Sequence, residues 1–128
     1  MSRHQITDLG ELEREALEIV WKHGSASAET VQKDLARPLK ESTVRTVLKR
    51  LEEKAHLTHT VRNRTFIYAA SESRPAAAAR AVKGIIDRFC HGSTEEVLVG
   101  LVEARILDRR ELQRLADKIA KAKGGSKS

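Results

Sequence analysis

The pattern of apolar and polar positions changes from a helical period to a strand period between residues 42 and 68. Apolar residues recur every three or four positions from Val44 to Ala55, opposite a row of hydroxyl and basic side chains, as in an amphipathic helix. From Leu57 to Tyr68 apolar and polar residues alternate, as in two strands, and Asn63-Arg64 suits a tight turn because asparagine tolerates a positive φ. A polar helix followed directly by a hairpin with basic residues at its tip predicts a winged helix-turn-helix.

The preceding residues supply the other parts of that fold. A helical apolar stripe runs from Leu9 to Trp21, after the cap-type residues Thr7-Asp8 and before a glycine that can end the helix. Residues 25–27 can form only a short strand. Ser27 is a good N-cap for a second helix to about Ala36, and Pro38 prevents its continuation. The third helix is then predicted over residues 41–55.

The second half predicts three more helices and a separate domain. Residues 71–74, just before Pro75, mark a change of composition that we interpret as a hinge. The expected division is a DNA-binding domain at 1–70, a helical domain at 75–122, and a flexible tail at 123–128. The fold class is therefore mainly α, with a small β-hairpin wing.

Three short helices cannot bury their own apolar residues, because a core of this size rarely stabilises itself. We expect the surface to be buried against a second copy of the chain. The predicted dimerisation residues are Ile85, Ile86, Phe89, Val97, Leu98, Leu101, Val102, Leu112, Leu115 and Ile119.

Charge follows the same division. The chain has a formal net charge of +6. Residues 39–70 hold seven basic and three acidic residues, an excess that fits a polyanionic partner, but the second half is also basic, so charge alone does not locate the site. A single cysteine, Cys90, excludes an intrachain disulfide and fits a reducing cytoplasm, and no apolar run is long enough to span a bilayer.

Candidate DNA contacts lie on the third helix and at the wing tip. Arg45 could pair with guanine, and Thr43 and Thr46 could contact bases in the major groove. An ordinary solvated helix face and solubilising wing charges are the alternatives, and RNA is disfavoured because exposed aromatic residues are few. The predicted DNA-binding set is Ser42, Thr43, Arg45, Thr46, Lys49, Arg50, Arg62 and Arg64.

The sequence indicates no catalytic or cofactor site. It contains no nucleophile–base arrangement and no phosphate-binding glycine loop, so we do not expect an enzyme or a cofactor. His56 and His59 are interpreted as solvated or phosphate-adjacent imidazoles, since no carboxylate or thiol partner is near them in sequence. Cys90-His91 has too few ligands for a metal site within one chain, and the role of the cysteine stays open.

The residues of the third helix and hairpin resemble the penicillinase-repressor family, which includes the methicillin-resistance repressors. The resemblance rests on Thr43-Val44-x-Thr46-x-Leu48-x-Arg50-Leu51-x-x-Lys54, then Leu57 and Arg64-x-Phe66-x-Tyr68. It implies a homodimeric winged-helix repressor that binds an inverted-repeat operator and dimerises through its C-terminal helices.

The chain departs from the family pattern in ways that bear on this interpretation. Ala55 stands where members commonly have glycine, so the third helix is expected to close differently. The Asn-Phe bond that a sensor protease cuts in β-lactam-responsive members is absent, and Gly100-Leu101 is the best match. The cysteine cluster of copper-responsive relatives is also absent.

We therefore predict a homodimeric, cytoplasmic transcriptional repressor whose partners are operator DNA, a second copy and, for release, a sensor protease. The alternatives are a nonspecific architectural DNA-binding protein and a winged-helix protein-interaction module. The operator sequence, the regulated genes and the inducing signal cannot be predicted from the sequence.

Overall fold

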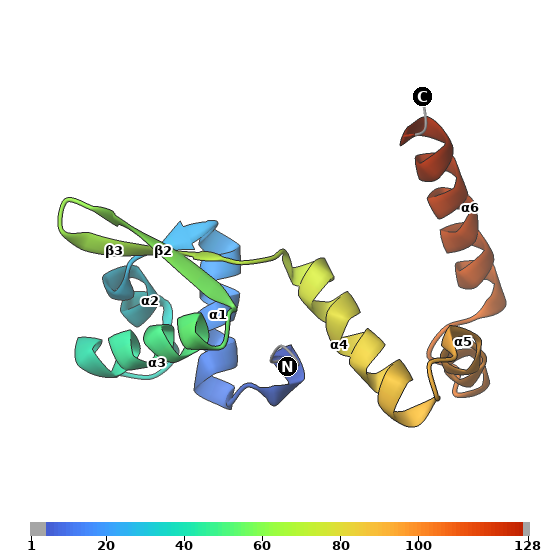
Figure 1. Ribbon diagram of the computed structural model, residues 1–128, viewed down its shortest axis with the longest axis horizontal. Coiled ribbons are helices and arrows are strands. Elements are labelled where there is room, and N and C mark those ends of the chain that lie inside the picture. The colour runs from blue at the N-terminus through green and yellow to red at the C-terminus, as the bar shows by residue number, and fades with distance from the viewer. Residues whose placement is uncertain (1–4, 127–128) are drawn as a thin grey trace. The chain divides into compact units, whose positions relative to one another are not determined.

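The computed structural model of the chain describes residues 5–126, with side chains through residue 122. It is mainly helical with one small antiparallel sheet, as predicted (Figure 1). The chain divides into two compact units between Gly84 and Ile85. No helix within the described residues combines the length and the apolar character needed to cross a membrane.

The N-terminal unit is a winged helix-turn-helix. A 3-10 turn, η1, precedes three helices and three strands whose order matches the prediction. The elements are η1 (Ile6–Asp8), α1 (Glu11–His23), β1 (Ser25–Ala26), α2 (Ala28–Asp34), α3 (Glu41–Glu53), β2 (Leu57–Arg62) and β3 (Thr65–Ala70).

The start of α1 differs from the expected one. The Asp8 carboxylate accepts a hydrogen bond from the backbone N–H of Gln5 at 3.1 Å, so it closes η1 and does not cap α1. α1 begins after Gly10, whose N–H donates to Glu13 Oε1 at 2.9 Å. Local side-chain pairing thus inserts a separate turn before the helix. The predicted cap of α2 is confirmed, since Ser27 Oγ accepts from the N–H of Thr30.

The core of this unit lies between the three helices and the sheet. The buried face of α3 consists of Val44, Val47, Leu48 and Leu51, and the other buried apolar residues are Ala16, Leu17, Val20, Ala26, Ala28, Val31, Leu35, Leu57 and Tyr68. Burial of this face fixes which side of α3 is exposed. Trp21 is only half-buried at the edge of this core, and its Nε1–H donates to the carbonyl of Glu72 at 3.0 Å.

Ala55 ends α3 in the left-handed region, with a φ of 69°. The N–H of His56 donates to the carbonyl of Leu51 at 2.9 Å, which is the bond that closes a Schellman motif. Glycine is the usual residue at such a position, but the alanine adopts its conformation. With alanine at position 55, α3 therefore ends in the same motif that glycine usually forms.

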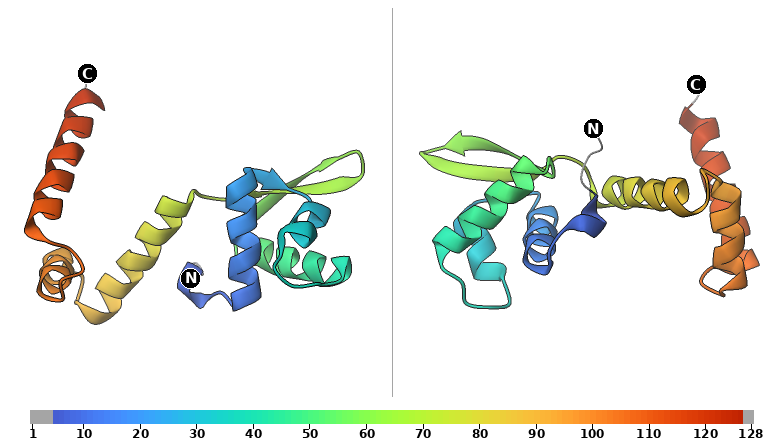
Figure 2. Two further views of the ribbon diagram at one scale, coloured as in Figure 1. Left: turned by 180° about the vertical axis from the view of Figure 1, so that it is seen from behind. Right: turned by 60° about the horizontal axis from the view of Figure 1, so that its bottom comes forward.

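The sheet has the strand order β1-β3-β2 and is antiparallel throughout. β2 and β3 pair from Leu57 with Ala70 to Arg62 with Thr65. Asn63 and Arg64 form the two-residue turn, with φ values of 52° and 65°, as type I′ hairpins require. The tip of this wing lies at the same end of the unit as the start of α3 (Figures 1 and 2).

α4 (Arg74–Phe89) spans the division between the units, and the C-terminal unit continues with α5 (Thr94–Glu103) and α6 (Arg109–Ser126). The Ser93 hydroxyl and the Asp108 carboxylate accept hydrogen bonds from Glu96 and Glu111, as expected of N-caps. The backbone of α6 continues through residues 123–126, the first part of the predicted tail, and the last two residues lie outside the described range. No residue from 85 to 122 is buried.

Candidate nucleic-acid interface

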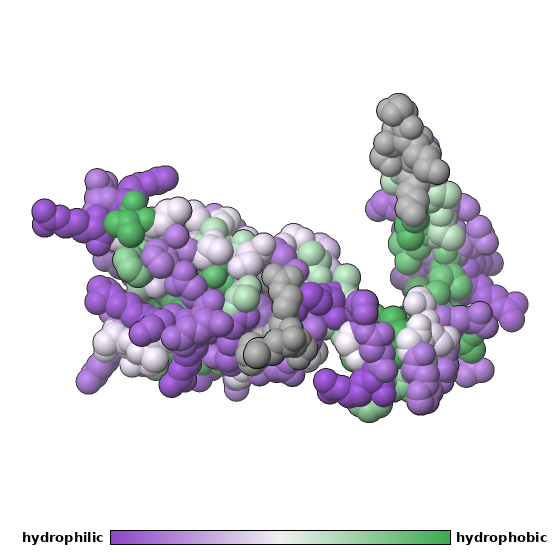
Figure 3. All heavy atoms as spheres, in the orientation of Figure 1, coloured by the Kyte–Doolittle hydropathy of each residue, from purple (hydrophilic) through white to green (hydrophobic). Residues whose placement is uncertain are grey.

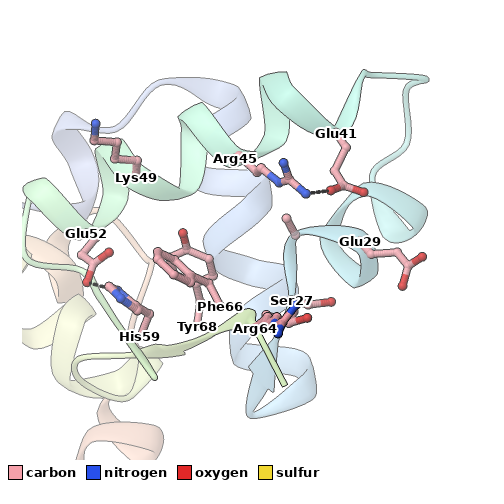
Figure 4. Close-up of a pocket in the computed structure, with 12 residues that line it drawn as sticks. Ser27, Glu29, Glu41, Arg45, Lys49, Glu52, His59, Arg64, Phe66 and Tyr68 are labelled. Carbon is pink, nitrogen blue, oxygen red and sulfur yellow. Dashed lines mark hydrogen bonds and ion pairs between the residues drawn. The ribbon is translucent and has the colours of Figure 1, made fainter. Parts of the chain in front are cut away.

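An open groove of about 820 Å³ lies between α3, the wing and the start of α2 (Figure 4). It is lined by both basic and acidic side chains together with aromatic rings of the wing. The lining residues are Ser27, Ala28, Glu29, Glu41, Arg45, Lys49, Glu52, His59, Arg64, Thr65, Phe66 and Tyr68.

The exposed face of α3 carries six residues of the predicted DNA-binding set, namely Ser42, Thr43, Arg45, Thr46, Lys49 and Arg50. Arg45 and Lys49 also line the groove, whereas the other four lie outside its lining. Within the described part of the chain, neither Lys49 nor Arg50 forms an ion pair, although the charge of Arg50 acts on the Glu13 carboxylate and helps to lower its pKa.

Two polar groups on this face already have partners within α3. The hydroxyl of Thr46 donates to the carbonyl of Ser42 at 3.1 Å. Its methyl group and lone pairs remain for a ligand. Arg45 forms an ion pair with Glu41, one helical turn earlier. This ion pair was not predicted, although the spacing of four residues along a helix is the sequence signal that indicates it.

The wing presents its residues on two faces. Arg62 and Arg64 are both exposed, and only Arg64 lines the groove. The cross-strand neighbours Val61 and Phe66 are 60% and 48% exposed near the tip. The wing therefore offers an apolar contact surface beside its two cations.

His59 connects the wing to α3. Its ring stacks on Phe66 with centroids 4.1 Å apart, and Nδ1 lies 2.6 Å from Glu52 Oε2 in the last turn of α3. The sequence interpretation of His59 as lacking a carboxylate partner is therefore wrong. His56 is also not solvated, because it is only 3% exposed. Burial, with a contribution from the Glu52 charge, raises the pKa of the neighbouring Tyr68 phenol, and the charge of Arg45 partly offsets this shift.

The groove is not uniformly positive. Three carboxylates line it, and two of them have cationic or imidazole partners, as Glu41 has Arg45 and Glu52 has His59 (Figure 4). The basic excess lies on the exposed rim, at Lys49, Arg50 and the wing arginines. Such a surface can hold a phosphate backbone along the rim while α3 contacts the groove of a duplex.

The predicted dimerisation residues are exposed or half-buried within the C-terminal unit. The four most exposed are Ile85, Phe89, Leu98 and Ile119, with Phe89 at 68%, and the half-buried ones are Ile86, Val97, Leu101, Val102, Leu112 and Leu115. Apolar side chains show on the surface of α5 and α6 in Figure 3. A mainly apolar hollow of about 500 Å³ is lined by Leu98, Val99, Val102 and Leu112, with Glu95, Glu103 and Arg109 beside them.

Cys90 is half-buried just after the end of α4. Within the described residues, no three or more histidine, cysteine, aspartate or glutamate side chains come together in a group that could hold a metal ion.

Comparison with known proteins relates nearly the whole chain to one family. The penicillinase repressor family matches residues 9–121. The penicillinase repressor of Bacillus licheniformis is 26% identical over 113 residues, which are 87% of this chain and 88% of that protein.

Two solved structures are similar to about half of the chain. The DNA-binding domain of the repressor BlaI is 29% identical over 55% of this chain and 88% of that chain, with a TM-score of 0.48. The monomeric form of Bacillus licheniformis BlaI in complex with the blaP half-operator has the same identity and coverage, with a TM-score of 0.47.

Proposed function

Because the chain belongs to the penicillinase repressor family, we propose that it is a transcriptional repressor that binds double-stranded operator DNA as a homodimer in the cytoplasm. The observation that carries the proposal is the exposed face of α3, whose hydroxyl and basic side chains stand beside a wing that carries Arg62 and Arg64. In this interpretation α3 enters the major groove, Arg45 and Thr46 contact bases, and Lys49, Arg50 and the wing arginines contact phosphates.

The test is a selection from a pool of randomised DNA duplexes with the full chain. A repressor should enrich one inverted-repeat sequence and bind it roughly 10³–10⁷-fold more tightly than scrambled DNA. A nonspecific architectural protein would enrich no sequence and would bind all duplexes with the same steep salt dependence. No binding even at low salt would instead favour a protein-interaction module.

Dimerisation is the second part of the proposal, and it assigns residues 75–122 to the interface. It is supported by the exposure of Ile85, Phe89 and Ile119 and by the lack of any buried residue from 85 to 122. A second copy would cover the apolar surface, and two linked DNA-binding units would hold an inverted repeat more tightly than either alone. Sedimentation of the full chain at micromolar concentration should show a dimer, and a monomer that still binds the full operator tightly would contradict this part.

Release from DNA by proteolysis is the third part. The Gly100-Leu101 bond lies within α5, and cutting it would separate Leu101 and all of α6 from the DNA-binding unit. A helical bond must open locally before a protease can cut it, and glycine favours that opening because it weakens the helix. Immunoblotting through derepression tests this step: a cleaved fragment is expected, and full-length protein throughout would rule proteolysis out.

A further inference from the structure

Glu41 is an acidic residue at a point where a DNA-binding surface is expected to be basic. It is the first residue of α3 and lines the groove, and its carboxylate forms an ion pair with Arg45. Figure 4 shows the two side chains directed toward one another along the helix. An acidic residue in this position repels phosphates, so its presence there requires a physical explanation.

Stability gives only a weak reason. The side chains of Arg45 and Glu41 are 67% and 38% exposed, and exposed ion pairs at this spacing contribute little to folding. A carboxylate in the first turn also interacts favourably with the helix dipole, and Glu29 likewise lies in the first turn of α2, as its second residue. Glu29 lines the same groove, which makes it a natural reference for a charge effect without the ion pair to Arg45.

The geometry of the pair gives a stronger reason. Side chains of a helix lean toward its N-terminus, so Arg45 leans toward Glu41 across one turn. The guanidinium has five N–H donors in a plane, and one carboxylate engages only part of them. Arg45 is therefore held in one orientation along α3 while donors remain for a second planar partner.

The charge of Glu41 also affects whether Arg45 contacts a base or a phosphate. Nonspecific binding comes from phosphate contacts, and a flexible arginine can make one on any sequence. An arginine paired with Glu41 brings a negative charge to any phosphate that it approaches. A guanine edge carries two neutral acceptors in a plane, N7 and O6, and does not impose that repulsion.

We propose that Glu41 is a positioning residue that determines specificity: it orients the Arg45 guanidinium for a base edge and disfavours its contact with phosphate. The inference rests on the proposed function, because it assumes that α3 reads a DNA sequence. It assigns to Glu41 a role that acts through Arg45 and not through the stability of α3.

The test compares Glu41→Gln with Glu29→Gln, each of which removes one negative charge from the groove. The probes are the duplex that wild-type protein enriches from the randomised pool and a scrambled duplex. One charge about 7 Å from a phosphate in water changes affinity about two- to threefold, so both variants should bind scrambled DNA more tightly by that factor. Only Glu41→Gln should lower the ratio of selected to scrambled affinity, by about fivefold or more, as expected when a bidentate base contact is impaired.

A double-mutant cycle with Arg45→Ala separates positioning from a general charge effect. If Glu41 acts through Arg45, Glu41→Gln should leave the affinity ratio unchanged in the Arg45→Ala background. Melting curves of the two glutamine variants should differ from that of wild type by a similarly small amount, because each variant removes one first-turn carboxylate and neither side chain is buried.

The outcomes separate this inference from the proposed function. An unchanged ratio in Glu41→Gln, or an equal loss with and without Arg45, overturns the inference while a selected sequence still supports the repressor. Failure of the wild-type protein to enrich any sequence overturns the proposed function itself.

Discussion

The ion pair between Glu13 in α1 and Lys54 at the end of α3 is expected to stabilise the N-terminal unit. Lys54 Nζ lies 2.9 Å and 3.1 Å from the two carboxylate oxygens, and the N–H of Gly10 donates to the same carboxylate. The Glu13 side chain is 11% exposed, whereas the Lys54 side chain is 28% exposed. The two partners therefore depend on the pair to different degrees.

The asymmetry of burial predicts unequal costs. Lys54→Met retains most of the aliphatic stem but leaves the buried Glu13 carboxylate with the Gly10 N–H as its hydrogen-bond donor and with the charge of Arg50. We expect a loss of about 2 kcal/mol, since a hydrogen bond to a charged group contributes roughly 1.5–3 kcal/mol and an unpaired buried charge is costly. Glu13→Gln keeps an acceptor for Gly10 and leaves a lysine that can reach water, so its loss should be about 1 kcal/mol.

Acidification should remove the contribution of this ion pair to the stability of the fold. Burial raises the pKa of Glu13, but the Gly10 N–H and the hydrogen bond and charge of Lys54 outweigh it, and the pKa lies below its ordinary value of 4.5. A carboxyl with a lowered pKa stabilises the fold above its unfolded pKa, and this stability is lost as the pH falls through the folded pKa. Wild type should therefore lose more stability than Glu13→Gln between neutrality and a pH well below 4.5.

Thermal unfolding of the full chain, followed by circular dichroism at one fixed protein concentration, measures both effects. A loss of about 2 kcal/mol lowers the Tm of a domain of this size by roughly 8–16 °C. Glu53→Gln, next to Lys54 but exposed, is the matched control and should melt with wild type. Equal melting of Lys54→Met and wild type would refute the stabilising role of the pair.

Three further predictions concern the helix end, the DNA contacts and the dimer. Ala55→Gly should raise the stability by about 1 kcal/mol in urea unfolding, because the left-handed conformation strains an alanine and not a glycine. Arg45→Ala should reduce discrimination between selected and scrambled DNA by roughly 1–3 kcal/mol, whereas Lys49→Ala should weaken both about equally and lower the salt slope by about one, as titrations at several salt concentrations will show. Leu101→Asp should shift the chain to monomer in sedimentation and greatly weaken operator binding, because it places an unpaired charge in the proposed interface.

Much of the N-terminal unit could be predicted because its signals are local. The buried face of α3 follows from apolar spacing alone, the cap of α2 from Ser27, and the hairpin turn from Asn63-Arg64. Each of these features depends on residues a few positions apart, so the local sequence is enough to predict it.

The features that were missed depend on how elements meet. The pairing of His59 with Glu52 requires the left-handed turn at Ala55, which brings the first strand of the wing back along the last turn of α3. The start of α1 was misplaced because Asp8 bonds to Gln5 and not to the helix.

One face of α3 is buried in the core, and the opposite face carries the residues proposed to contact DNA. Its C-terminal end is held by Lys54 on Glu13, and the turn before it is held by Gln32, whose side chain donates to the carbonyl of Leu39 at 2.8 Å. These contacts and the buried face set the position of the helix without using its exposed residues. Substitutions at exposed positions such as Arg45 and Lys49 should therefore change DNA binding while leaving the stability within about 0.5 kcal/mol. If α3 reads DNA as proposed, its base contacts can therefore change without a cost to the fold.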